Sequence, residues 1–260
     1  MKSASMPIPS PTGRSPLGTL QDGGTRVPLP DMETCRKFLL GFSREISVPR
    51  GTKLMIGNVF YLLEGAVSLT AVSATGERHS LVYFEPGDLL SFIPSVNHVY
   101  SIPHEAFDFL LYNESLAMFA QTPCRLVCTD HRQFMRHMDE EPIKTLLIRG
   151  LASNLLKVIV QSVNNCTLSA TVRVCRMLSV FMQKEEPHAI PRYLTHTEIA
   201  GHLSLHVMTV TKIFHSLRRE GILGRIHGVT LVKDPARLMS LASQKSLLSY
   251  KNAGAESPRT

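Results

Sequence analysis

The residues best suited to recognising another molecule lie between Thr195 and Leu217, where helical signals and a turn signal alternate. Thr195-His-Thr-Glu198 has the spacing of a capping box. In that motif the threonine hydroxyl accepts from the amide of the glutamate, and the glutamate returns to the amide of the threonine. Ser204-Leu205 falls where a sharp turn is needed before a second helix. This arrangement predicts a helix-turn-helix, whose second helix can enter the major groove of DNA.

The second helix carries side chains that can read base edges. Its apolar positions, Val210, Ile213, Phe214 and Leu217, share an inward face and leave an outward face on the first turns. Lysine can donate to guanine O6 and N7, threonine can donate or accept, and apolar side chains can contact thymine methyl groups. We therefore assign base reading to five residues: His206, Val207, Met208, Thr211 and Lys212.

Basic residues flank this helix and continue beyond it. Residues 192–233 carry a net charge of +4, whereas residues 35–140 carry −2. Gly224 to Asp234 is predicted to form two strands around a His227-Gly228 turn, which is the pattern of a wing. Arginines and lysines at such positions lie along the phosphate backbone and hold the protein in register. The residues assigned to backbone contact from this pattern are Arg218, Arg219, Arg225 and Lys233.

The elements before this region are predicted to be mostly strands. Six prolines among residues 1–34 predict a disordered lead-in. Short apolar runs between turn signals then predict a small antiparallel barrel or jelly roll. The expected strands are 45–48, 53–55, 59–63, 65–72, 79–84, 88–90, 98–102, 106–112 and 124–128, with a short helix at 113–121.

Helices are predicted from Thr129-Asp130 onward, where a capping pair starts residues 131–137. A long helix follows Asp139-Glu-Glu-Pro142. Its apolar residues cover about half of its surface, which is wider than one packing partner needs. We expect the β-roll to cover one side and a second copy of the chain to cover the other, with an ordinary core helix as the alternative. The dimer interface is assigned to Leu147, Leu151, Leu155 and Ile159.

The order of β-roll, long helix and winged helix-turn-helix resembles the Crp/Fnr family of bacterial transcription regulators. The most specific stretches are Tyr61–Thr70, Phe84–Leu89 and Leu194–Leu223. The resemblance implies a homodimer whose roll senses a small effector, with RNA polymerase as a further partner if the protein is an activator. It also places Lys212 where the family usually has a base-reading arginine. Thr209 matches a common threonine beside that position, and Thr209 and Thr195 join the backbone set.

Three departures from the family pattern bear on mechanism. His206-Val-Met208 replaces the usual Ser-Arg-Glu, which removes a guanine donor and a cytosine acceptor. The stretch from Gly87 to His98 has neither the Gly-Glu nor the later Arg-Ser or Arg-Thr pair of cyclic-nucleotide binders. Only Cys35 lies where iron-sulfur members cluster their cysteines. The sequence therefore argues against cyclic AMP and an iron-sulfur cluster, and it leaves the effector unidentified.

Two other functions remain open from sequence. A cupin-type metal enzyme would share the jelly roll, but His79, His98 and His104 are isolated and lack the close His-x-His pair that such enzymes need. An architectural DNA-binding protein without any effector would also fit. Cys124 and Cys128 share a strand face and are expected to be small buried residues, with a redox or haem sensor as the alternative. We expect no enzyme activity and no metal site.

The expected fold class is α+β. We divide the chain into a tail (1–34), a β-roll (35–138), a dimerisation helix (139–165), a winged helix-turn-helix domain (166–242) and a second tail (243–260). Its first residues contain no apolar run of the kind that signals secretion, and no run of about 18 apolar residues could span a membrane. These features predict a cytoplasmic protein whose partner is double-stranded DNA.

Overall fold

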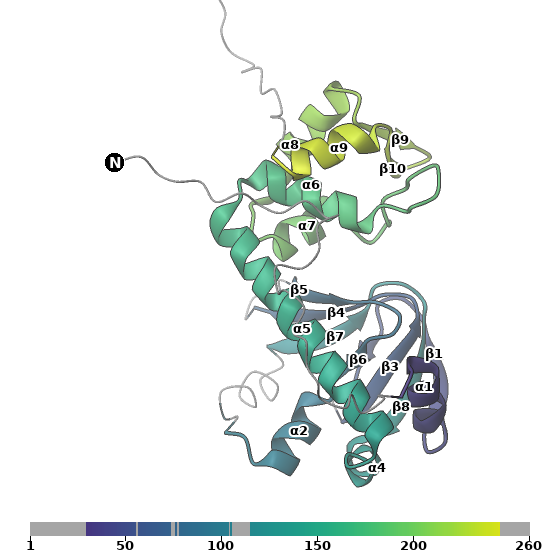
Figure 1. Ribbon diagram of the computed structural model, residues 1–260. Helices are drawn as coiled ribbons and strands as arrows, with labels where there is room; N and C mark the ends of the chain where they lie inside the picture. The colour runs from purple at the N-terminus through teal and green to yellow at the C-terminus, as the bar shows by residue number, and fades with distance from the viewer. Residues whose placement is uncertain are drawn as a thin grey trace, which may run out of the picture.

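The computed structural model describes residues 30–55, 57–73, 76, 78–103, 105 and 115–244. Figure 1 shows three parts in the order that the sequence predicts: a β-roll, the long helix α5 (Glu141–Thr167) and a C-terminal helical domain with a small wing. Helix α5 runs along the roll and continues into the C-terminal domain. The fold class is therefore α+β, as predicted. Among the helices that the structure describes, none is long and apolar enough to cross a membrane.

The roll consists of two four-stranded antiparallel sheets. One sheet has the strand order β1-β8-β3-β6 and the other has the order β2-β7-β4-β5. Strands β4 and β5 form one edge hairpin, and β5 is the last strand of its sheet. The strand bounds are β1 Arg44–Val48, β2 Lys53–Leu54, β3 Asn58–Glu64, β4 Val67–Val72, β5 Arg78–Phe84, β6 Leu89–Leu90, β7 Leu116–Ala120 and β8 Cys124–Asp130.

Two of the predicted elements of the roll are wrong in type. Residues 98–100 of the strand expected at 98–102 belong instead to helix α2, Ile93–Tyr100, which has Pro94 in its first turn. The short helix expected at 113–121 is instead strand β7, which pairs with both β2 and β4. Pairing on both sides supplies hydrogen bonds that a short isolated helix would lack, so tertiary contacts decide the outcome. The strand expected at 106–112 lies outside the described residues.

The boundary of the predicted N-terminal tail is also wrong. Helix α1 spans Met32–Leu40 and begins at Asp31, whose carboxylate accepts from the amide of Thr34 at 2.8 Å. Cys35 and Leu39 are buried in the core between the roll and α5. Apolar contact with the roll therefore stabilises helix α1, although its first residues, 32–34, fall in the predicted proline-rich tail.

Polar capping residues start the later helices where the sequence predicts them. Asp130 caps α4, His131–Arg136, and Ser169 caps α6, Ala170–Phe181. In each case the side-chain oxygen accepts a backbone amide inside the first turn. Helix α5 has Pro142 in its first turn and runs two residues beyond the predicted end at 165.

Helix α5 packs one face on the roll and exposes another. Gly150 lies so close to Phe92 that an added Cβ would approach the ring within 3.2 Å. Leu147 is only 6% exposed and belongs to this roll-facing core, so assigning it to an exposed dimer face is wrong. Leu151, Leu155 and Ile159 are 41%, 60% and 47% exposed. The apolar arc therefore has one covered side and one uncovered side.

The C-terminal domain surrounds its own core. Its elements are α6, α7 His196–His202, α8 Val207–Arg219, β9 Leu223–Ile226, β10 Val229–Val232 and α9 Pro235–Ala242. The core contains the four inward residues predicted for the second helix, Val210, Ile213, Phe214 and Leu217. Tyr83 of strand β5 also belongs to this cluster, so the roll contributes a side chain to the core of the C-terminal domain.

Candidate nucleic-acid interface

Helices α7 and α8 form the predicted helix-turn-helix. Thr195 caps α7 by accepting the amide of Glu198 at 3.1 Å. Ala200, 2% exposed, belongs to the same core cluster as Val210 and Phe214 of α8. Ser204 adopts a left-handed conformation with φ of 51° in the turn, and the amide of Leu205 returns to the carbonyl of Ala200 at 2.8 Å. The turn therefore has fixed geometry and holds α8 against α7.

The first turns of α8 present an exposed face. His206 caps the helix through Nδ1, which accepts the amide of Met208 at 3.2 Å and leaves Nε2 for an outside partner. His206, Val207, Met208 and Lys212 are all exposed. Thr211 is half-buried, and its hydroxyl is 3.1 Å from Nδ1 of His196 on α7. Four of the five predicted base-reading residues are thus free to meet a ligand, and the fifth is already hydrogen-bonded.

The wing has the predicted geometry. Strands β9 and β10 pair antiparallel around His227 and Gly228, whose φ values are 48° and 79°. Two consecutive positive φ values are typical of the tight turns that match strand twist in hairpins. Arg225 is exposed on β9. Lys233 is exposed just after β10, and its methylene stem lies against Gly224, so that a larger residue at position 224 would displace this flexible side chain.

Between the wing and the two helices lies a basic cavity of about 530 Å³. Its lining includes Arg218 at the end of α8, Arg225 on the wing and Thr195 at the start of α7, which all belong to the predicted backbone set. Arg192, His196 and His227 add three further basic side chains. A concave site with several cations beside an exposed helix suits a phosphate group.

His196 and Arg192 were missed as site residues by the sequence analysis. Burial, together with the nearby positive charges of Arg218 and Arg225, holds the pKa of His196 below its usual value. The only sequence signal for His196 is its place at the first helical position after the cap. Its contact with Thr211, fifteen residues later, is a property of the folded domain.

Glu198 departs from the predicted capping box. The amide of Thr195 donates to the carbonyl of Tyr193 at 2.9 Å, so the expected return bond from Glu198 is absent from the described contacts. Its carboxylate instead accepts from the hydroxyl of Tyr83 at 2.6 Å and from the hydroxyl of Ser80, both on β5. Two donors on the roll therefore hold the first helix of the DNA-binding unit.

Neighbouring contacts strengthen this junction. Nδ1 of His202 lies 2.8 Å from the carbonyl oxygen of Ser80, and the carbonyl of His202 accepts from Nε2 of Gln161 on α5 at 2.6 Å. Burial lowers the pKa of His202, and burial with the charge of Glu198 raises that of Tyr83. Both side chains are therefore neutral at pH 7. Helix α7 is bound to the roll and to α5 at once.

A β-bulge makes the double contact with Glu198 possible. In the β4–β5 hairpin Leu69 pairs with Val82 and Thr70 pairs with Ser80, so Leu81 is an extra residue on β5. Side chains three residues apart on a regular strand point to opposite faces. The extra residue brings the Ser80 and Tyr83 hydroxyls to the same carboxylate oxygen.

The described residues contain no group of three or more His, Cys, Asp or Glu residues that could hold a metal ion. Cys124 and Cys128 are buried free thiols, as expected for small core residues. His98 lies on helix α2, and His104 is outside the described residues.

Comparison with known proteins agrees with the geometry of this site. Residues 172–241 match the family model of the Crp-like helix-turn-helix domain. The nitrogen fixation regulation protein FixK of Bradyrhizobium diazoefficiens is 27% identical over 194 residues, which cover 71% of this chain and 74% of that protein.

Two solved structures show the same fold. A CRP/FNR-family transcriptional regulator from Thermus thermophilus superimposes with a TM-score of 0.60 at 22% identity, covering 76% of this chain and 98% of that one. CLP of Xanthomonas campestris, described as a c-di-GMP-responsive global regulator, gives a TM-score of 0.59 at 16% identity, covering 78% and 100%.

The exposed face of α8, the wing and the basic cavity define a DNA-binding protein of the winged helix-turn-helix class. The match to the Crp-like domain and the shared architecture place it more narrowly. Residues 172–241 form a Crp-like helix-turn-helix domain, and the chain as a whole is similar to transcription regulators of the Crp/Fnr type in sequence and fold. The relative and the two solved structures named above are all described as regulators.

Proposed function

We propose that the protein is a homodimeric, effector-responsive regulator that binds a two-fold symmetric DNA site. The observation that carries the proposal is that the chain has two exposed surfaces. One is the face of α8 with His206, Val207, Met208 and Lys212, and the other is the apolar stripe of α5 with Leu151, Leu155 and Ile159. The roll (35–138), the long helix (139–165) and the C-terminal domain (166–242) take the roles of sensor, dimer contact and DNA reader. The corresponding place of action is the cytoplasm, with RNA polymerase as a partner if the protein activates transcription.

The roles at the DNA follow from reach. His206, Val207, Met208, Thr211 and Lys212 lie on the first turns of α8, which approach base edges when such a helix enters the major groove. The basic cavity lies beside that helix and takes a backbone phosphate through Arg218 and Arg225. Thr195, Thr209, Arg219 and Lys233 complete the backbone set.

The exposed stripe of α5 supports dimerisation. Leu151, Leu155 and Ile159 recur at helical spacing on the side away from the roll. Removing such an apolar stripe from contact with water lowers the free energy of the protein. A second copy of α5 has a matching stripe, and an isologous contact between the two generates the two-fold axis of a symmetric DNA site.

The roll contains a cavity suited to a small apolar effector. The cavity has a volume of about 160 Å³ and lies between the roll, α2 and α5, where Val82, Phe84, Phe92 and Met118 contribute to an almost entirely apolar lining. None of the described lining residues is charged, so a cyclic phosphate finds no cation there. Oδ1 of Asn154 is buried in this lining without a hydrogen-bond partner. An occupant with one N–H or O–H donor would satisfy it.

Selection of bound sequences from random DNA, followed by sedimentation of the complex, tests the core of this proposal. We expect an inverted repeat with half-site centres about one helical turn apart and two protomers for each duplex. A single unrepeated site bound by one protomer would contradict the dimer model.

A further inference from the structure

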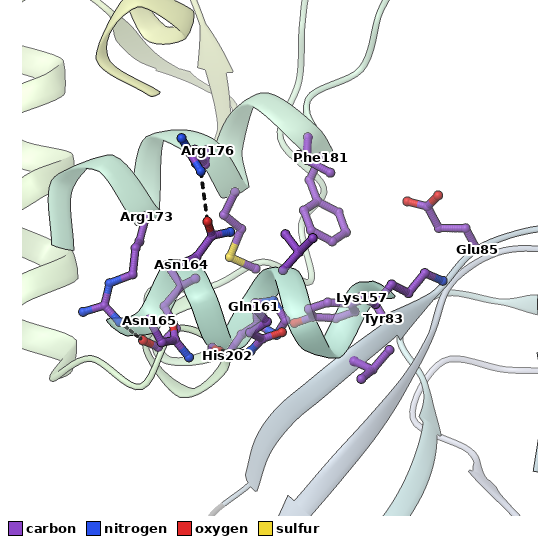
Figure 2. Close-up of a pocket in the computed structure, with 15 residues that line it drawn as sticks. Tyr83, Glu85, Lys157, Gln161, Asn164, Asn165, Arg173, Arg176, Phe181 and His202 are labelled. Carbon is purple, nitrogen blue, oxygen red and sulfur yellow. Dashed lines mark hydrogen bonds between the residues drawn. The ribbon is translucent and has the colours of Figure 1, made fainter. Parts of the chain in front are cut away.

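A third cavity lies at the junction between the roll and the C-terminal domain; of its lining residues it shares Val82 with the roll cavity and none with the basic cavity beside the wing. It has a volume of about 310 Å³, at the lower end of the range typical of small-molecule sites. Its walls come from four elements: β5, the C-terminal half of α5, α6 and the end of α7. Figure 2 shows the labelled side chains of these elements around the cavity.

One side of the cavity carries two guanidinium groups without a carboxylate partner. Arg173 and Arg176 lie three residues apart on α6 and therefore share a face. Nη1 of Arg173 donates to Oδ1 of Asn165 at 3.1 Å and to the carbonyl of Leu203 at 2.8 Å. These partners are neutral oxygens, so the positive charge of Arg173 remains uncompensated.

Arg176 is bonded in the same way. Its Nε donates to the carbonyl of Ala242 at 2.9 Å, and its Nη1 donates to Oδ1 of Asn164 at 2.9 Å. Among the described residues, no acidic side chain lies within 4 Å of either arginine, and neither Nη2 group makes a hydrogen bond. Two half-buried cations with spare donors are a site for an anion.

The other charged groups at the cavity do not compete for this role. Glu85 is exposed and lies at the far end of the cavity from the two arginines in Figure 2. Lys157 is already paired with Asp88, at an N–O distance of 2.5 Å. The remaining lining is largely apolar and includes Met177, Val180 and Phe181.

We propose that this junction cavity binds a carboxylate with an apolar chain of medium length. The carboxylate accepts hydrogen bonds from the Nη2 groups of Arg173 and Arg176, and the chain lies against Met177 and Phe181. This ligand differs from the proposed occupant of the roll cavity, because the described lining of the roll cavity contains no charged residue. Because its walls come from both domains and from α5, an occupant stabilises the arrangement in which α7 contacts β5.

The site is compatible with the proposed dimer. The residues of α5 that line it are Lys157, Val160, Gln161, Asn164 and Asn165. Asn164 is nine residues from Leu155, which places the two side chains on opposite sides of the helix. A second copy of α5 centred on the Leu155 stripe therefore contacts the side of the helix opposite Asn164.

The chain contains no tryptophan, which allows a single reporter to be introduced in the full-length protein. Val180 is 70% exposed at this cavity, so Val180→Trp places an indole at its rim. We expect octanoate to shift the emission of this indole and to bind at least tenfold more tightly than neutral octanamide. Met239→Trp, at a residue of α9 that is 51% exposed and does not line the cavity, is the matched control and should not respond.

The indole of Val180→Trp stands at the rim and could block the cavity. Calorimetry on the unmodified chain therefore tests binding without it. Octanoate should give a binding heat that Arg176→Gln reduces at least tenfold in affinity, with the folded state checked by circular dichroism. Equal affinity for the acid and the amide would overturn the proposal, as would an equal response at position 239 or a heat unaffected by Arg176→Gln. No DNA is present in these measurements, so their outcome is independent of the proposed DNA-binding roles.

Discussion

The exposed stripe on α5 allows a quantitative prediction about assembly. Complete burial of a leucine or isoleucine side chain contributes about 1.5–3 kcal/mol. With 60% of Leu155 and 47% of Ile159 exposed, covering them contributes about 1–2 and about 0.7–1.4 kcal/mol in each protomer. A symmetric dimer contains each residue twice, so the pair contributes about 3–6 kcal/mol to association.

We expect Leu155→Ala with Ile159→Ala to weaken the dimer by about two to four orders of magnitude, since 1.4 kcal/mol corresponds to a factor of ten. Replacing both residues by glutamate should produce monomers at any working concentration, because the carboxylates would be buried unpaired. Alanine and glutamate both favour helix, so α5 itself should remain intact.

Sedimentation equilibrium across a wide concentration range measures this effect. Met239→Glu is the control, because Met239 is similarly exposed, at 51%, but lies on α9. A dimer dissociation constant within about threefold of the parent value for the double alanine variant would place the interface elsewhere. Loss of dimer in the Met239→Glu control would instead indicate a general effect of added charge.

Four further predictions concern ligands. Lys212→Ala should cost ~1–3 kcal/mol and relax preference at one base position in each half-site. Arg225→Ala should instead weaken binding to all sequences and lower the salt slope by about one unit, and salt titrations on selected and random DNA distinguish the two outcomes. A phosphate beside His196 should raise its depressed pKa, so DNA binding takes up a proton and affinity should rise between pH 8 and pH 6. His196→Asn should flatten that dependence in titrations at constant ionic strength, and an unchanged slope would refute the role of His196. Calorimetry with cyclic AMP should detect no micromolar binding, because the described lining of the roll cavity has no cation.

Local signals predict much of this structure. Asp130, Ser169, Thr195 and Asp234 each accept a backbone amide in the first turn of the helix that follows. The wing turn at 227–228 depends on two adjacent residues. Such features involve neighbours along the chain, so a single sequence contains the information that determines them.

Contacts between distant residues account for the errors. The sequence of strand β7 predicts a helix, but in the structure β7 pairs with β2 on one side and with β4 on the other. Leu147 has the same apolar character as Leu151, and only packing against the roll separates their roles. Glu198 satisfies the sequence pattern of a capping box, yet its carboxylate accepts hydrogen bonds from Ser80 and Tyr83, more than a hundred residues away. The junction cavity likewise has no sequence signature, because four separate elements form it.

The bulge at Leu81 has a thermodynamic consequence for how the regulator would be titrated. Val82 lines the roll cavity, and its neighbour Tyr83 donates to Glu198 of the DNA-binding unit. Any occupant that moves this strand and thereby changes DNA affinity by some factor must have its own affinity changed by the same factor when DNA is bound. The dissociation constant of the effector measured on free protein would then differ from its dissociation constant on protein bound to a promoter. The concentration that switches a gene would therefore depend on how tightly its own operator is held.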